Sequence, residues 1–293
     1  MTFDIEIKNL SLYYRQFTAL NDISLNLESG RIYGLLGRNG AGKTSLLTLL
    51  ATFRKVKKGS IQIDGEDPFE NAAVMQHIAF HYEADYSELT ENIKDMLNSA
   101  ERYRPYFDRD YAHYLADRFK LPLKKPIKKL SRGMQSAFEV TLGLASRTPL
   151  TIFDETYLGM DAPAREIFYR ELLEDQASHP RTIILSTHLV SEMDYLFDDV
   201  IILDQGRIIL HEDYETLVSK GASITGAAEE VDAFVTGMTK LNEQELGNTK
   251  AVMVYGELAD ARRTEAQRKG LEVGPISLQD LFIYLTSEEA RYE

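Results

Sequence analysis

The chain has 293 residues, 44% of them hydrophobic and 27% charged, values that exclude a disordered, collagen-like or coiled-coil protein and allow one large α/β domain plus a smaller unit. Its 33 basic and 46 acidic residues leave a net charge of −13, opposite in sign to a general binder of nucleic acid or anionic membranes. Cysteine is absent, which excludes disulfides, zinc–thiolate sites and a cysteine nucleophile.

The first half of the chain alternates between strand-like and helix-like patterns. Apolar and polar residues alternate over 4–27, which predicts strands and does not fit a secretory signal peptide. A short apolar run at 32–36 predicts a buried strand, and leucines at helical spacing in 43–53 predict the helix that follows it. Residues 59–64 predict another strand. Charged and aromatic residues at helical spacing then predict an inserted helical subdomain at about 86–148.

The second half returns to parallel-sheet patterns, which end near residue 215. Apolar runs at 150–153 and 182–185 are typical of buried strands, and 200–210 predicts a closing hairpin. We therefore expect a first domain over 1–215 and an α+β accessory domain over 216–293. The accessory domain has a candidate strand at 252–255 and candidate helices at 229–234, 259–269 and 277–286. No apolar run approaches the ~20 residues that span a bilayer, so we expect no membrane crossing.

A glycine-rich phosphate-binding pattern, G-x-x-x-x-G-K-[ST], lies between the strand at 32–36 and the helix after it. Its glycines allow the backbone to approach phosphates, Lys43 can reach the β- and γ-phosphates, and Thr44 can ligate Mg²⁺. Ser45 is placed to contact the α-phosphate. An ordinary glycine turn that caps a helix is the alternative interpretation. The residues of the pattern are Gly37, Arg38, Asn39, Gly40, Ala41, Gly42, Lys43 and Thr44.

Two acids follow the apolar run at 150–153 and supply a second element of such a site. Asp154 would hold Mg²⁺ through water, and Glu155 would polarise the water that attacks the γ-phosphate. Without the phosphate loop, the two acids would simply mark a strand leaving the core. Together with the loop, they predict nucleotide hydrolysis.

With these motifs in order, the chain resembles the ATP-binding cassette (ABC) family, the nucleotide-binding subunits of ABC transporters. Residues 130–134 resemble the family signature LSGGQ, in which the serine and the second glycine donate to the γ-phosphate held by the opposite subunit. Ser131 and Gly133 keep these roles, whereas Arg132 replaces the first glycine and Met134 the glutamine. Ser131 is also a candidate N-cap for the helix that follows.

The resemblance assigns further roles by position in the motif series. His188 corresponds to the switch histidine that contacts the γ-phosphate and the catalytic glutamate, and Asp161 would cross the dimer interface. Tyr14 matches the aromatic residue that stacks on adenine, with Tyr13 as its rival. Glu83 stands where the family has a glutamine and could ligate Mg²⁺, although an exposed loop acid is the alternative.

The resemblance implies the fold class: an α/β P-loop NTPase (ABC ATPase) core with an inserted helical subdomain and a small α+β C-terminal appendage. It also implies ATP and Mg²⁺ as cofactors, a second ATP-binding subunit (homodimer or heterodimer), a transmembrane permease subunit, no nucleic acid, and a place on the cytoplasmic face of the cell membrane. The C-terminal segment 276–282 looks like the end of single-cassette bacterial multidrug, antimicrobial-peptide and YtrB-like subunits, so export is the expected direction.

Two other functions share some of these features. A soluble ABC ATPase that acts on a ribosome, on DNA or on an assembly complex has the same motifs, because fold does not dictate function. Such proteins resemble two linked cassettes or carry a long coiled coil, which this length and pattern do not provide. A small-molecule kinase shares the phosphate loop but would not need the signature or the switch histidine.

Overall fold

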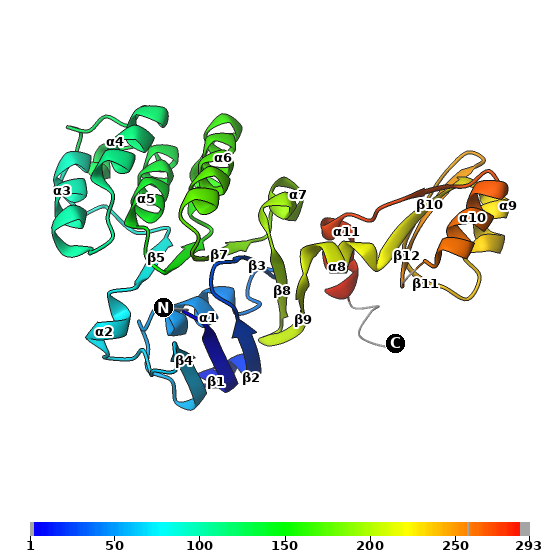
Figure 1. Ribbon diagram of the computed structural model, residues 1–293, viewed down its shortest axis with the longest axis horizontal. Coiled ribbons are helices and arrows are strands. Elements are labelled where there is room, and N and C mark those ends of the chain that lie inside the picture. Colours follow the sequence, from blue (N-terminus) through cyan, green and yellow to red (C-terminus); the bar gives the residue numbers. More distant parts are fainter. Residues whose placement is uncertain (1–2, 257, 288–293) are drawn as a thin grey trace.

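The computed structural model describes residues 3–256 and 258–287, and it shows a larger body joined to a smaller sheet-and-helix unit at one end of an elongated molecule (Figure 1). The larger body contains a six-stranded sheet, a three-stranded sheet and a group of helices. The smaller unit is built on a four-stranded sheet. No helix in the described ranges is both long and apolar enough to span a membrane.

The six-stranded sheet places the loops of the site. Its strands, in spatial order, are β5 (Ile78–Tyr82), β6 (Leu150–Asp154), β7 (Thr182–Thr187), β3 (Ile32–Leu36), β8 (Asp199–Asp204) and β9 (Arg207–Asp213). The first five are parallel and β9 returns antiparallel, which confirms the predicted buried strands and the closing hairpin. Because parallel strands end at the same edge of a sheet, the residues that follow β3, β6 and β7 meet there.

The three-stranded sheet packs beside the helix that follows the phosphate loop. Its order is β2 (Phe17–Leu27), β1 (Ile5–Tyr14) and β4 (Lys58–Ile63), all antiparallel. Helix α1 (Lys43–Leu50) buries its leucines in the same apolar cluster as these strands and the strands of the larger sheet. The phosphate loop is therefore anchored by core packing on both sheets.

Helices occupy the inserted region that the sequence predicts. Within the region predicted at about 86–148 they are α3 (Ile93–Tyr103), α4 (Arg109–Arg118), the 3₁₀ turn Ile127–Lys129 and α5 (Arg132–Ser146). The short helix α2 (Ala72–Met75) precedes this region, between β4 and β5. Helix α5 lies directly on the sheet, because a Cβ at Gly143 would stand 2.3 Å from the Phe153 ring. After β6 come the 3₁₀ turn Thr156–Gly159 and α6 (Ala162–Ser178), and after β7 come α7 (Val190–Met193) and the 3₁₀ turn Asp194–Leu196.

The accessory unit has its own small apolar core. Helix α8 spans Tyr214–Ser219, so the boundary expected between residues 215 and 216 lies within this helix. The sheet order is β11 (Thr239–Leu246), β12 (Thr249–Tyr255), β10 (Gly221–Ala227) and β13 (Glu272–Gly274), covered by α9 (Ala228–Phe234) and α10 (Asp260–Arg268). Only β12 was predicted among these four strands. Residues 257 and 288–293 of the expected domain lie outside the described residues.

The last helix, α11 (Leu278–Leu285), joins the accessory unit to the larger body. It contacts α7 and β11, and Leu278, Leu281 and Phe282 belong to the same apolar cluster as the helices of the larger body. Figure 1 shows α11 near α7 and α8, away from α10 and α9. The amphipathic helix predicted at 277–286 is therefore covered by its own chain.

Candidate nucleotide-binding site

The phosphate loop connects β3 to α1 in a conformation that requires glycine. Gly40 and Gly42 have φ of 82° and 110°, in the left-handed region that side chains disfavour. A Cβ at Gly42 would also stand 2.6 Å from the Ala19 carbonyl oxygen. The loop leads into the first turn of α1, where backbone N–H groups and the helix dipole favour an anion.

Lys43 is a buried ammonium group at this turn, with 6% of the residue exposed. Its Nζ donates to the Gly37 carbonyl at 2.7 Å and lies 3.4 Å from the Glu155 carboxylate. A buried charge is expensive to leave unpaired, so these partners stabilise Lys43 in the absence of phosphate. The same ammonium group is available to phosphate oxygens in the cavity that it lines.

Thr44 and Asp154 are brought together from α1 and the end of β6. The Thr44 hydroxyl donates to Asp154 Oδ2 at 2.6 Å, while Oδ1 is buried and has no hydrogen-bond partner among the described residues. A buried, unpartnered carboxylate oxygen beside a hydroxyl is a donor set that suits a hard cation. The described residues contain no cluster of three potential ligands, so a cation here would take its remaining ligands from phosphate and water.

Glu155 faces the same cavity from an unusual backbone conformation. Its φ and ψ are 54° and 20°, left-handed for a residue with a Cβ. One carboxylate oxygen, Oε1, lies within reach of Lys43 and also 3.0 Å from His188 Nδ1. His188 follows β7, which pairs with β6, so two adjacent strand ends bring the acid and the imidazole together. A carboxylate oriented in this way can accept a proton from water.

The cavity over the loop measures about 280 Å³ and is lined in part by an aromatic residue that is not among the candidates predicted from sequence. Phe17 lines it together with Ala19, the loop residues, Ser45 and Glu155. The Phe17 side chain is exposed, as an aromatic residue available for stacking must be. Tyr14 lies outside this lining: its hydroxyl is 3.5 Å from Ser45 Oγ, and the Arg54 guanidinium covers its ring at 4.8 Å. The sequence feature that could have identified Phe17 is its position as an aromatic residue at the start of β2.

The signature residues lie elsewhere on the same chain. Ser131, Gly133 and Asp161 line a second cavity of about 530 Å³, which no phosphate-loop residue lines. Ser131 Oγ accepts from the Met134 N–H and caps α5, as predicted, and Asp161 caps α6 by accepting from the Ala164 N–H at 3.0 Å. A Cβ at Gly133 would stand 2.9 Å from the Gly159 carbonyl oxygen, so the helix start fits closely against the turn after β6.

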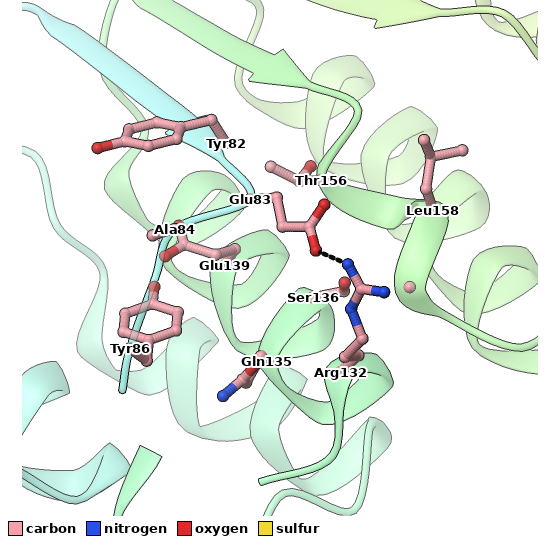
Figure 2. A pocket seen from close by; sticks show the side chains of 11 residues that line it. Tyr82, Glu83, Ala84, Tyr86, Arg132, Gln135, Ser136, Glu139, Thr156 and Leu158 are labelled. Atoms are coloured by element: carbon pink, nitrogen blue, oxygen red, sulfur yellow. Dashed lines mark hydrogen bonds and ion pairs between the residues drawn. The ribbon is translucent and has the colours of Figure 1, made fainter. Parts of the chain in front are cut away.

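Glu83 pairs with Arg132, which joins the two places where the chain departs from the family pattern. Figure 2 shows the two side chains reaching toward one another in a groove of about 440 Å³, from the end of β5 and the start of α5. Both side chains are largely exposed. The sequence analysis treated the two positions separately, because side-chain contact between distant loops has no periodic signal.

A buried histidine lies beneath this groove. His81 Nδ1 contacts the Glu139 carboxylate at 2.8 Å, which ties β5 to α5. Burial lowers the pKa of His81 below its ordinary value, although the Glu139 hydrogen bond opposes this shift. His81 is therefore neutral near pH 7 and donates to Glu139 through Nδ1.

The fold and motifs agree with comparisons to known proteins. Residues 20–157 match the sequence profile of the family described as "ABC transporter". The ABC transporter ATP-binding protein YtrB of Bacillus subtilis is 29% identical, with 70% of each chain covered. The Nod factor export ATP-binding protein I of Sinorhizobium fredii is 27% identical over 98% of this chain and 87% of its own length. A solved structure, "Structure of ATP binding subunit of ABC transporter", is 25% identical with a TM-score of 0.64 over 73% of this chain and 91% of that one. Residues 20–157 therefore form a domain of the ABC transporter family, and the chain is similar over most of its length to ATP-binding subunits of such transporters.

Proposed function

We propose that two ATP-binding subunits share each ATP and drive a separate transmembrane permease on the cytoplasmic face of the cell membrane. The observation that carries this proposal is the division of the site. The loop that would hold the phosphates and the signature that would donate to them line different cavities of one chain. A second subunit can complete both cavities by placing its Ser131 and Gly133 against the nucleotide held by the first.

Within the proposed site, each residue of the loop cavity has one task. Backbone N–H groups of the loop and the Lys43 ammonium hold the phosphates, and Phe17 or Tyr14 stacks on adenine. Thr44 and Asp154 would hold Mg²⁺, which when bound neutralises phosphate charge. Glu155 accepts a proton from the attacking water, and His188 holds the Glu155 carboxylate in position through the 3.0 Å contact.

Glu83 fits this scheme as a residue with two alternative partners. Its present partner is the Arg132 guanidinium. An exposed ion pair contributes only about 0–1 kcal/mol, so a cation near the γ-phosphate can compete for the carboxylate. We therefore propose that Glu83 exchanges Arg132 for the metal when nucleotide binds.

The direction of transport is proposed from a relative. The Sinorhizobium fredii relative is named for Nod factor export and aligns with nearly the whole of this chain, accessory unit included. Export is therefore the direction that the proposal takes. Purifying the chain from its native membrane and identifying the membrane protein that accompanies it tests the permease part of the proposal.

The shared site is tested by mixing two defective chains in a Glu155→Gln background, which traps bound ATP. Lys43→Ala removes the phosphate contact, and Ser131→Arg blocks the opposite half of the site. Each variant alone should trap little ATP. A dimer of one Lys43→Ala chain and one Ser131→Arg chain should trap about one ATP. One of its two sites is intact and makes the charge-assisted phosphate contacts. No gain on mixing, although mixed dimers form, would contradict shared sites between identical chains.

A further inference from the structure

We infer that the accessory unit positions His188 through helix α7, which is held between α11 on one side and the Arg165 guanidinium on the other. The inference rests on the proposed catalytic role of His188 and adds a control point to it. It assigns Leu281 of α11 and Glu192 of α7 as positioning residues, since neither reaches the nucleotide cavity.

Helix α7 cannot orient itself. It has four residues, begins two positions after His188, and has no side-chain N-cap. A single helical turn in water is unstable, because nucleation fixes several residues for very few hydrogen bonds. The Leu189 N–H donates to Thr187 Oγ1 at 2.9 Å. This hydrogen bond spans His188 and connects the start of α7 to the end of β7. The contacts that fix the position of α7 therefore also fix the position of the His188 imidazole.

The accessory unit provides the contacts on one side of α7. Val190 and Met193 of α7 are buried in the same apolar cluster as Leu278, Leu281 and Phe282 of α11, and the two helices are in contact. Helix α11 is itself fixed at its start, where Ser277 Oγ accepts from the Asp280 N–H at 3.0 Å. Leu281 is fully buried in the cluster, so truncating it would open a cavity against α7.

An ion pair provides the other side. Arg165 Nε lies 2.9 Å from Glu192 Oε2, and a second guanidinium nitrogen lies 3.2 Å from Oε1, so the pair has two contacts. The same guanidinium donates to the Met160 carbonyl at 3.0 Å, one residue before Asp161. Helix α7 is thus connected to the segment that would cross the dimer interface, as well as to the accessory unit.

These contacts place the effect on the chemical step rather than on nucleotide binding. His188 touches the site through Glu155 Oε1, whereas helix α1, which carries Lys43 and Thr44, packs its leucines in a different apolar cluster. A shift of α7 would misplace the imidazole and leave Lys43 and Thr44 where they are. A misplacement of about 1 Å in a catalytic contact can cost as much as about 100-fold in rate.

The test compares two buried leucines in the full-length chain, by steady-state ATP hydrolysis and by ATP binding in equilibrium dialysis. Leu281→Ala should lower kcat by about 10-fold with the Kd for ATP unchanged, and Leu281→Met should restore kcat. Leu271→Ala is the matched control, because Leu271 is buried in the separate core of the accessory unit. It should leave kcat within about two-fold. Equal losses of kcat in Leu271→Ala and Leu281→Ala would overturn the inference.

A second pair of variants avoids core cavities and tests the ion-pair contact of α7 independently of Leu281→Ala. Glu192→Ala should lower kcat by about 2- to 5-fold, the range expected for a partly exposed ion pair, while Glu174→Ala on the exposed face of α6 should not. An unchanged kcat in Glu192→Ala would overturn the role of the ion pair. His188→Ala separates the two proposals: unchanged hydrolysis in that variant would refute the catalytic role itself, whereas a loss there without any loss in Leu281→Ala would refute only the positioning.

Discussion

The Glu155→Gln substitution should change ATP binding and ATP hydrolysis in opposite directions. Glutamine keeps the shape of the side chain but cannot accept a proton from water, so kcat should fall by about 100-fold or more. It also removes the negative charge that lies 3.4 Å from Lys43 Nζ. ATP phosphates would then no longer compete with the Glu155 carboxylate for the ammonium group, and the affinity for ATP should rise.

The size of the affinity gain follows from the geometry of the pair. Two unit charges 3.4 Å apart attract by about 5 kcal/mol at an effective dielectric constant of 20. Glu155 is 28% exposed, so water screens the pair, and the ammonium keeps its bonds to loop carbonyls after the substitution. We therefore expect a net gain of about 1 kcal/mol, or about 5-fold in Kd.

Isothermal titration calorimetry with ATP and a phosphate-release assay measure the two effects on the same preparation. Glu174→Gln, on the exposed face of α6, is the control for a carboxylate lost elsewhere. Near-normal turnover in Glu155→Gln would refute the assignment of the catalytic base. Lost turnover with weaker ATP binding would instead show that Glu155 does not compete for Lys43.

Three further predictions address residues around this site. Phe17→Ala should weaken ATP binding by about 5- to 100-fold, since stacking on a base contributes about 1–3 kcal/mol. Binding of tripolyphosphate, which has no base, should stay unchanged. If the base-dependent loss appears in Tyr14→Ala instead, the adenine stacks on Tyr14. Glu83→Ala should raise the Mg²⁺ concentration needed for half-maximal hydrolysis. Arg132→Gly should lower that concentration by about 2- to 5-fold, because the Glu83 carboxylate then has no ion-pair partner. If the concentration changes in neither variant, Glu83 is only a loop acid. Because burial lowers the pKa of His81, the unfolded chain binds more protons below about pH 6.5, so stability should fall as pH drops through that value. Urea unfolding at pH 7.5 and 5.5 should show a smaller loss for His81→Gln than for the unchanged chain, and equal losses would contradict the assignment.

The parts of the site that could be predicted from sequence are those with local causes. The glycine loop needs φ values that glycine allows, and the apolar run of β6 ends in the carboxylate of Asp154, so both features mark the sequence directly. Parallel strand order then brings His188 and Glu155 together without further information. These elements combine local pattern with a general rule about sheet edges.

The parts that could not be predicted depend on contacts between distant segments or on weak patterns. Strand β11 is exposed along nearly its whole length, so no apolar alternation marks it. The pairing of Glu83 with Arg132 joins residues 49 positions apart, and the contact of α11 with α7 needs the whole fold in place. For the same reason, nothing in the sequence indicates that the last helix of the accessory unit lies against the helix that follows His188.

The left-handed backbone at Glu155 sets stability against activity at a single position. A side chain in this conformation costs about 1–2 kcal/mol, which glycine would avoid apart from about 0.5–1 kcal/mol of extra chain entropy in the unfolded state. Laboratory evolution for heat resistance, with no requirement for turnover, should therefore accept Glu155→Gly. Glycine there would relieve the backbone strain but would also remove the carboxylate that pairs with Lys43 and is proposed to act on water, so a thermostability redesign of this chain should keep Glu155.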